Sequence, residues 1–588
     1  MAEYSPMMQK YLETKKEYED CVLFYRLGDF YEMFFDDAIN VSRELELTLT
    51  GKDCGQEERA PMCGIPYHAA DSYINRLVEK GYKVAICEQV EDPKTAKGLV
   101  KREVIKVVTP GTNFNPMALD ETKNNYIMCV AYMPDSIGLA TSDITTGEFL
   151  ITEVSSEREL IDEINKFTPS EILFNEAFTI SGINISDLKD RLSFAESVLE
   201  PWYFDDKNDE DIILRHFNVA TLDGLGISDY KTAVVAAGAL LNYLYETQKN
   251  SLPHLTRITL MPYSSGKYML IDSSTRRNLE LVETMREKQK KGSLLWVLDK
   301  TKTAMGARLL RNMIEQPLLI KDDIVARQKA VTEFINNYVD CAELREYLNP
   351  VYDLERLVGR ISTKSASPRD LIAFKGSIAM LPPIKKLLAS FKSSLIKSIY
   401  EELDVLEDIC SLIEASIVDE PPIAIKDGGL IKEGYNEEID RLRHAKTDGK
   451  QWLLNLEASE KERTGIKNLK IKYNKVFGYY FEVTNSFKNM VPDDYIRKQT
   501  LTNAERFTTL KLKELEEVIL SAEDKLFSLE YDLFTEVRDR IAGEVLRIQT
   551  TAKAVAKADV FSNLAIVAMQ NNYVCPVSYT HLTLPTNR

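Results

Sequence analysis

Apolar and polar residues alternate over the first 110 positions in a way that predicts strands and helices in turn. Residues 21–35, CVLFYRLGDFYEMFF, read as extended backbone. The helical pattern of residues 36–46 opens with Asp36 and Asp37, whose carboxylates favour the positive end of a helix. A second helix is predicted over residues 69–81, where Gly81 supplies a C-cap, and a strand over residues 82–90. We therefore predict a small mixed α/β domain over residues 1–115.

The same kind of alternation predicts a second α/β domain. Residues 126–133, 137–145 and 147–154 are short strand signals separated by turn residues. A helical pattern over residues 155–167 and a further strand, EILFN, follow them. This order resembles a ribonuclease-H-like unit, and we place it at residues 122–252.

From residue 264 onward the pattern is helical almost throughout. One segment breaks it, because residues 466–486, IKNLKIKYNKVFGYYFEVTNS, alternate apolar and polar positions and are rich in Tyr, Phe and Val. We expect helices over 264–432, a segment with a small β-tip over 433–503, and a second helical arm over 504–574. The predicted fold class is multi-domain: α/β, then long helices with a small β insertion.

Length and composition narrow the class of protein. With 588 residues the chain has room for about four domains. The longest apolar run, residues 232–245, is too short to cross a bilayer, and the N-terminal residues lack a signal-peptide pattern. We therefore expect a cytoplasmic protein with no membrane partner. The net charge of −17 argues against a surface coated with nucleic-acid-binding side chains, but it leaves room for a local basic groove.

Phe30 and Glu32 are the first candidate binding pair. In one continuous strand they would share a face with Arg26 and Gly28, since residues two apart point the same way. An aromatic ring beside a carboxylate, next to a bare glycine, is suited to stacking on a base and reading its edge. The ordinary alternative is a core Phe beside a surface Glu.

Clustered cations are the second candidate. Residues 461–475 hold six of them against the single acid Glu462. Such a run is usually a solvated face, and phosphate contact is the alternative. The candidates for holding a nucleic-acid backbone are Lys467, Lys470, Lys472, Lys475, Arg497, Lys498 and Asn503, together with Lys97, Lys101, Arg102 and Lys106 in the first domain.

Catalytic and metal-binding signals are weak. Asp143 in TSDITTGEF lies where a ribonuclease-H-like nuclease would keep a metal carboxylate, but two-metal hydrolysis needs several converging acids and no clear set is present. A turn-capping Asp is the favoured interpretation. The eight cysteines form no C-x-x-C pair and the five histidines no metal-ligand spacing, so no metal site and no catalytic residue is predicted. Arg276 and Arg277 in STRRNLEL could form a basic site, although packing at a helix entry is the favoured role.

Several motifs carry a resemblance to a known family. FYRLGDFYEMFFDDA, DITTGEF, STRRNLEL, KIKYNKVFGYYFEVTNS and NAERFTTLKLKELEEVIL closely resemble the bacterial MutS family of DNA mismatch repair proteins, and the likeness extends to about Val574. The resemblance implies a mismatch-recognition domain, a connector, a core with first lever helices, a clamp and a second lever arm at the five ranges given above.

The resemblance also implies roles and partners. Phe30 would wedge beside a mispaired or unpaired base from the minor groove, and Glu32 would hydrogen-bond that base. The implied partners are double-stranded DNA with mismatches or small loops, a second copy of the intact protein, and the downstream repair factor MutL. The connector role speaks against the nuclease alternative, and the intact Phe30-x-Glu32 speaks against a junction-binding relative of the family.

One family feature is absent from the sequence. The family's ABC-type ATPase domain, which uses ATP and Mg²⁺, needs a phosphate loop G-x-x-x-x-G-K-S/T, and none occurs in the 588 residues. We therefore expect no ATPase activity and no cofactor in this chain. Residues 578–588 are expected to be a non-native tail. Without the ATPase domain, apolar surface is expected to be exposed near FSNLAIVAM, residues 561–569.

Overall fold

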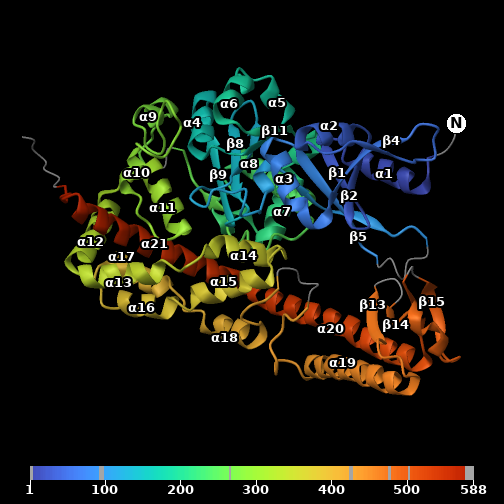
Figure 1. Cartoon of the computed structure of the whole chain (residues 1–588). Coiled ribbons are helices and arrows are strands. Elements are labelled where there is room, and N and C mark those ends of the chain that lie inside the picture. Colours follow the sequence, from blue (N-terminus) through green and yellow to red (C-terminus); the bar gives the residue numbers. More distant parts are fainter. Residues whose placement is uncertain are drawn as a thin grey trace, which may run out of the picture. The chain divides into compact units, whose positions relative to one another are not determined.

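The computed structural model describes residues 4–91, 98–263, 266–422, 428–474, 478–500 and 503–576 (Figure 1). The chain divides into two compact units. The first contains Met1–Ser365, Gly376–Leu406 and Ala542–Arg588, and the second contains Ala366–Lys375 and Glu407–Ile541.

The first domain is built on a six-stranded sheet with the order β3-β4-β2-β1-β5-β6. Its strands are β1 (Cys21–Leu27), β2 (Phe30–Phe34), β3 (Thr50–Lys52), β4 (Ala60–Pro66), β5 (Lys83–Gln89) and β6 (Arg102–Val108), and its helices are α1 (Pro6–Glu17), α2 (Phe35–Leu45) and α3 (Ala70–Glu79). The expected helices and the strand β5 are confirmed. The expectation of one extended segment over 21–35 is wrong, because the chain reverses at Gly28 and Asp29 and forms the hairpin β1–β2.

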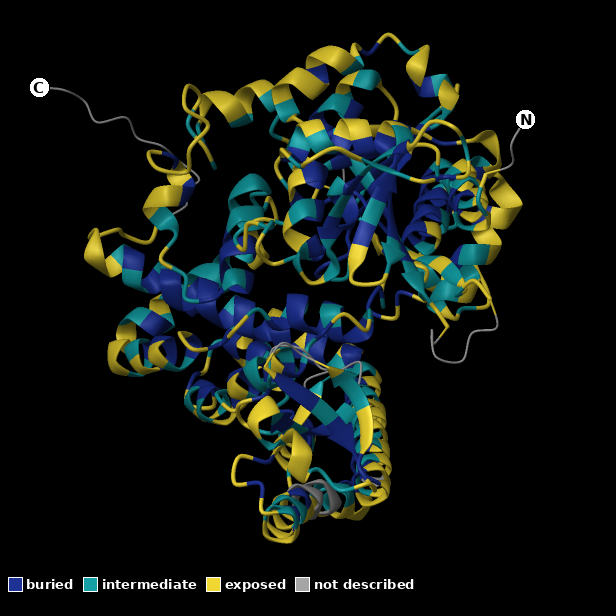
Figure 2. Ribbon diagram, turned by 45° about the vertical axis from the view of Figure 1, so that its right-hand side comes forward, coloured by how far each residue is buried: buried dark blue, intermediate teal, exposed yellow. Residues whose placement is uncertain are grey.

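Both faces of this sheet are covered, which explains the density of aromatic residues in the opening stretch. On one face Phe24, Tyr31 and Met33 pack in a buried cluster with residues of α2 and α3. On the other, the Tyr11 ring of α1 meets the ring of Phe34 edge to face at 4.9 Å. Figure 2 shows the central strands in dark blue.

The second domain has a sheet with the order β11-β10-β7-β8-β9-β12. Strands β7, β8 and β9 are antiparallel neighbours, and β10 and β11 add parallel to β7. The elements predicted over 126–175 are all present. The bounds are β7 (Ile127–Tyr132), β8 (Ile137–Asp143), β9 (Glu148–Val154), α4 (Glu157–Phe167), β10 (Glu171–Phe174), α5 (Glu176–Thr179), α6 (Ile185–Leu192), β11 (Ala195–Val198), α7 (Asp206–Phe217), α8 (Lys231–Gln248) and β12 (Thr259–Leu260).

The remaining helices of the first unit gather around α21 (Val545–Gln570), which contacts α11, α12, α13, α14 and α17. These helices are α9 (Ser273–Asn278), α10 (Leu294–Leu298), α11 (Ala304–Glu315), α12 (Lys321–Asn336), α13 (Tyr338–Leu348), α14 (Leu354–Ser362), α16 (Leu381–Leu388) and α17 (Ser394–Glu402), and α15 (Pro368–Ile378) has residues in both units. Phe561, Ala565 and Val567 are at most 2% exposed because neighbouring core helices cover them, whereas Met569 is 37% exposed. The expectation of exposed apolar surface near 561–569 therefore holds only at the C-terminal end of this stretch.

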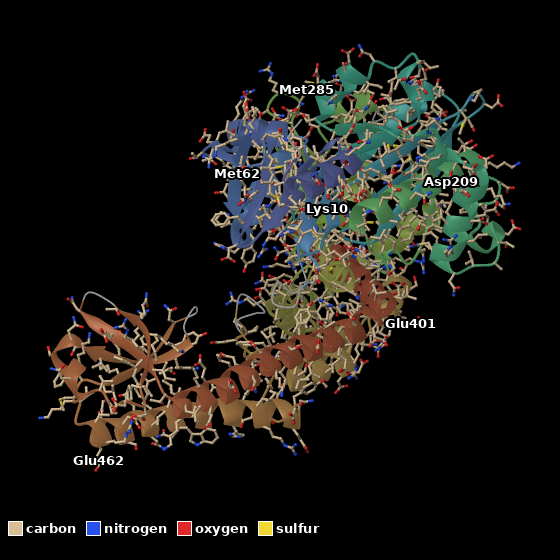
Figure 3. The ribbon with its side chains drawn as sticks, turned by 90° about the vertical axis from the view of Figure 1, so that its right-hand side faces the viewer. Lys10, Met62, Asp209, Met285, Glu401 and Glu462 are labelled. Atoms are coloured by element: carbon tan, nitrogen blue, oxygen red, sulfur yellow. The ribbon has the colours of Figure 1, made fainter. Side chains whose placement is uncertain are left out.

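The second unit is a long helical pair that carries a sheet. It contains α18 (Glu407–Ser416), α19 (Glu437–Thr464), β13 (Lys470–Asn474), β14 (Gly478–Thr484), β15 (Ile496–Thr500), β16 (Ala504–Thr508) and α20 (Leu510–Ala542). Arg443 of α19 donates to Glu530 of α20 at 2.6 Å, and Figure 3 labels Glu462 near the end of α19 that adjoins the sheet. The sheet has the order β13-β14-β16-β15, and its last strand in the chain, β16, lies beyond residue 503, where we expected the β-tip segment to end.

Among the described residues, no helix is both long and apolar enough to cross a membrane.

Candidate nucleic-acid interface

The hairpin β1–β2 decides which side chains accompany Phe30 and Glu32. In the observed register Leu27 lies opposite Phe30, and Tyr25 lies opposite Glu32. Residues directly opposite each other share a face of the sheet, so the expected grouping with Arg26 is wrong. The error arises because a two-residue turn reverses the chain and changes which positions coincide. Gly28 takes a φ of 60°, which glycine adopts without strain.

Phe30 and Glu32 do share one face, as predicted, and a glycine of β4 lies beside them. Gly64 is the register partner of Glu32, and Phe30 is paired with Pro66. A Cβ at Gly64 would lie 3.5 Å from Glu32 Cγ and 4.0 Å from Phe30 Cδ1. Phe30 is 45% exposed, although the next residue of its strand, Tyr31, is buried. The arrangement therefore presents an aromatic ring and a carboxylate together on an open strip of sheet.

The carboxylate of Glu32 is paired with Lys52, a residue that the sequence pattern did not single out. Lys52 Nζ donates to Glu32 Oε2, and the Glu32 side chain is 15% exposed. The pairing arises because β3 places Lys52 next to β4, on the side away from β1. The only sequence signal for it is a lone Lys in a short polar strand. The ion pair offsets part of the negative charge beside Phe30.

Arg26 lies on the opposite face and has a packing role there. Its guanidinium carbon is 3.7 Å from the centroid of the Tyr67 ring, and Nη1 donates to Glu88 at 3.2 Å. Glu88 also accepts a hydrogen bond from the Tyr31 hydroxyl. Burial, followed by this hydrogen bond, raises the pKa of Tyr31. These contacts fix the strand that carries Phe30.

The four cations proposed for the first domain are placed differently from one another. Lys101 is exposed and pairs with Glu103 at 2.6 Å. Arg102 is half-buried, and its Nε donates to the Arg26 carbonyl at 2.7 Å. Lys106 Nζ lies 4.9 Å from the Phe114 ring centroid, and burial lowers its pKa to about 8. Lys97 lies outside the described residues. Lys101 thus has the most open side chain of the described three.

One face of the sheet in the second unit is polar. Lys470 lies opposite Glu482, and Lys472 lies opposite Tyr480, so these four residues share a face. Lys472 Nζ donates to Glu482 Oε1 at 2.7 Å, and this hydrogen bond raises its pKa. Lys467 precedes the first strand and is exposed, as Lys470 is. Lys475 lies outside the described residues.

The strands β15 and β16 of the same sheet hold the remaining candidates. Arg497 is exposed, with Nη1 3.7 Å from Glu505 Oε1, while Lys498 is half-buried with Nζ 3.9 Å from Glu516 Oε2. Asn503 is exposed just before β16.

Arg506 is a cation of this sheet that the sequence analysis missed. It pairs in register with Glu482, and its guanidinium carbon lies 4.5 Å from the Tyr480 ring centroid. The signal for it is the alternation in NAERFTT, which places it on the lysine face.

Asp143 caps a turn, as favoured from the sequence. It is fully buried, and Oδ1 accepts from the backbone N–H of Thr145 at 2.9 Å and from its hydroxyl at 2.6 Å. Oδ2 accepts from the side chain of Asn124 at 2.9 Å. In the part of the chain that the structure describes, no group of three or more His, Cys, Asp or Glu is placed to hold a metal ion. The geometry therefore does not favour the nuclease alternative.

Comparisons with known proteins match most of the chain to consecutive domains of one protein family. Three family models match it: MutS domain I over residues 5–116, MutS domain II over 125–256, and MutS domain III over 274–565. These ranges contain the hairpin of Phe30, the domain of Asp143 and the helical units with their sheet.

Curated relatives agree. A protein of Lachnoclostridium phytofermentans named DNA mismatch repair protein MutS is 62% identical over 584 residues, which is 99% of this chain and 62% of the relative. Proteins of the same name from Ruminiclostridium cellulolyticum and Acetivibrio thermocellus are 54% and 53% identical, each over 98% of this chain and 66% of the relative. The chain thus spans 62% to 66% of the length of these relatives. On these three domain matches and this level of identity, the chain belongs to the MutS family.

Proposed function

We propose that this chain binds double-stranded DNA and recognises mispaired or unpaired bases in mismatch repair. The observation that carries the proposal is the pair Phe30 and Glu32, an exposed ring and a carboxylate side by side next to Gly64. Family membership and the printed names of the relatives support the same function.

The physical basis is the cost of deforming DNA. Inserting an apolar side chain from the minor groove unstacks a base step, which costs a few kcal/mol in an intact duplex. A mismatch or an unpaired base lowers that cost, so the same ring binds defects more readily than matched sequence. Recognition then depends on deformability and needs no particular base sequence.

Glu32 contributes to the discrimination. A carboxylate directed toward a polyanion opposes binding unless it gains a hydrogen-bond partner on a displaced base. The ion pair with Lys52 offsets part of the charge of Glu32, so we propose that Glu32 opposes the binding of matched DNA only in part. Lys52 donates to Oε2, which leaves Oε1 as the oxygen for a base.

The sheet of the second unit, which we call the clamp, is proposed to hold phosphates without reading bases. Lys467 and Lys470 carry the proposal because both are exposed cations at one end of the sheet. Arg497 on β15 and Asn503 before β16 are further candidates. Lysine contacts to phosphates supply affinity that depends on salt and is indifferent to base sequence.

We also propose that these 588 residues do not hydrolyse ATP, since they contain no phosphate loop of the form G-x-x-x-x-G-K-S/T. For the longer proteins of the family to which this chain belongs, we propose ATP and Mg²⁺ as cofactors. We propose a second copy of the protein and MutL as their partners.

The proposal is tested by binding to two duplexes, one matched and one with a single unpaired thymine, followed by fluorescence anisotropy. Phe30→Ala is expected to weaken binding to the looped duplex by about 1 to 3 kcal/mol, the worth of a lost base stack, and to leave matched binding almost unchanged. Trp202→Ala, which removes a 53% exposed aromatic ring from the second domain, is the matched control and is expected to change neither. Equal losses on both duplexes with Phe30→Ala would contradict the proposal.

A further inference from the structure

A cleft of about 780 Å³ lies between the second domain and the helices of the core, within the first unit. One wall is formed by the segment before β7 and the ends of α4 and α6. The other is formed by α9, the loop over 281–288, α11 and α14. Met285, labelled in Figure 3, marks that loop. A volume of this size is typical of small-molecule sites.

The charge of this cleft is opposite to that of the chain. Eight lysine and arginine side chains line it against three carboxylates, whereas the whole chain has a net charge of −17. A local excess of cations in such an acidic protein is not explained by composition. The excess creates a positive potential that attracts anions.

Two of the arginines have buried N–H groups that lack a hydrogen-bond partner among the described residues. Arg356 is 9% exposed; its Nη2 donates to the Lys123 carbonyl at 2.6 Å, but its Nε makes no hydrogen bond and has only Asp353 at 3.8 Å. Arg276 donates from Nε to the Ile271 carbonyl at 3.1 Å, while its buried Nη1 has no such partner. Burial lowers the pKa of Arg276. Unsatisfied buried donors are costly, so a ligand that accepts from them would be stabilised.

The helix-entry role expected for Arg276 and Arg277 thus explains only part of the arrangement of these two side chains. The Nε contact of Arg276 fits that role, because it ties the side chain to the backbone just before α9. Arg277 is exposed and lines the cleft, as does the exposed Lys123 on the facing wall. Of the three carboxylates, Glu315 has Oε1 3.7 Å from Nε of Arg311 on the same helix.

We propose that this cleft binds a small ligand with clustered phosphates, either an inorganic polyphosphate or the triphosphate of a nucleotide. Guanidinium groups present planar forks of donors that match phosphate oxygens, and charge-assisted bonds of this kind are the strong ones. A ligand that carries several phosphates would use the cations of both walls at once. It would therefore join the second domain to the core by contacts that neither part makes alone.

The test is isothermal titration calorimetry on the full 588-residue chain with sodium tripolyphosphate and, separately, with ATP in the absence of divalent ions. Saturable binding of at least one of them is expected. The variant Lys123→Ala with Arg277→Ala removes one exposed cation from each wall and is expected to weaken that binding by about tenfold or more. The matched control, Lys207→Ala with Arg215→Ala, removes exposed cations of α7 that lie outside the cleft and is expected to leave the affinity unchanged.

The two ligands separate the two sources of phosphate. ATP that binds at least about tenfold more tightly than tripolyphosphate would identify a nucleotide, and comparable affinities would identify the polyphosphate alone. Absence of saturable binding for both, or an equal loss in the control variant, would overturn the proposal. Tight binding of a poly-glutamate peptide by a chain that binds neither phosphate ligand would also overturn it, in favour of an acidic protein segment. Unfolding curves of both variants check that the fold is kept.

Discussion

Glu32 of β2 lies directly opposite Gly64 of β4, and a Cβ at Gly64 would stand only 3.5 Å from Glu32 Cγ. Because Gly64 has no side chain, the side chain of Glu32 and the neighbouring Phe30 ring occupy the surface above β4. The geometry of the proposed recognition pair is therefore set by a third residue that has no side chain.

Substitutions at Gly64 are expected to separate recognition from stability. Gly64→Ala adds a methyl group at ordinary van der Waals distances, the nearest being 3.4 Å from the Tyr31 carbonyl, and is expected to change the free energy of unfolding by less than about 0.5 kcal/mol. Gly64→Leu is expected to displace the Phe30 ring and to reduce the preference for a looped duplex, with matched binding kept. Gly138→Ala is a contrasting control for the stability assay, since its Cβ would stand 2.0 Å from the Thr232 carbonyl. A Gly64→Leu variant with full discrimination would contradict this account.

The ion pair between Glu32 and Lys52 predicts a coupled effect on DNA affinity. Glu32→Gln is expected to tighten matched binding by up to about 1 kcal/mol, because in the proposed complex it removes a partly exposed charge that would face phosphates. The same change in a Lys52→Met background is expected to tighten it more, since the carboxylate there has lost its compensating charge. A double-mutant cycle at low salt measures the difference. Identical effects of Glu32→Gln in both backgrounds would show that the ion pair does not act on DNA binding.

The clamp lysines are expected to act on all duplexes alike. Replacing Lys467, Lys470 and Lys472 by Ala should lower the affinity for matched and looped DNA equally, and the slope of log K against log salt should become shallower by roughly 0.9 for each phosphate that is no longer neutralised. Lys472 alone should matter less than Lys470, because its ammonium already pairs with Glu482 at 2.7 Å. The control triple Lys321, Lys392 and Lys397→Ala removes exposed core cations. A weakening confined to looped DNA would show that the clamp assignment is wrong.

Asp209 predicts a pH dependence of stability. Its carboxyl, labelled in Figure 3, is buried against Gly238 of α8, and neither oxygen has a hydrogen-bond partner among the described residues. Burial, with repulsion from Asp205 and Asp206, raises its pKa from 3.8 to about 8. The folded state therefore holds this proton more tightly than the unfolded state, and the free energy of unfolding falls as the pH rises between those two values.

Asp209→Asn keeps the shape without the charge, so it should flatten that dependence. For each 1 kcal/mol by which the substitution stabilises the fold at pH 8, the midpoint of thermal unfolding is expected to rise by about 2 to 4 °C. At pH 5 the midpoint is expected to change little. Asp211→Asn, at an exposed position of the same helix that is not among the causes of the raised pKa, is the control. A lower midpoint at pH 8 for Asp209→Asn would contradict the prediction.

The sequence predicted those features that depend on local pattern. The helices over 36–46 and 69–81 and the strands of the second domain follow from periodicity, and the structure confirms them. Asp36 and Asp37 lie in the first turn of α2, as expected, but no side chain caps its N-terminus. The hairpin at Gly28 was missed because one continuous strand and two short ones have the same alternation, and only the two-residue turn distinguishes them.

Contacts between distant strands and helices could not be predicted. The pairing of Glu32 with Lys52 and the position of Gly64 depend on the strand order β3-β4-β2, which a single sequence does not specify. From the sequence, Lys106 and Arg102 are candidates for contacting a nucleic-acid backbone, but their neighbours in space are Phe114 and the Arg26 carbonyl. The roles proposed for Phe30, Glu32 and the clamp residues stay predictions until the binding experiments are done.

The central position of α21 has a consequence for synthesis. Asp559, in this helix, accepts hydrogen bonds from the backbone N–H of Lys302 and of Thr303, just before α11. The ribosome must add more than 250 residues after Thr303 before this acceptor exists, which takes roughly 13 to 50 s at about 5 to 20 residues per second. During that interval the apolar faces of α11 to α14 have no central helix to pack on. The nascent core is therefore expected to need protection from aggregation until residue 570 has left the ribosome, and the two α/β domains, whose sheets are complete by residue 260, should already be folded by then.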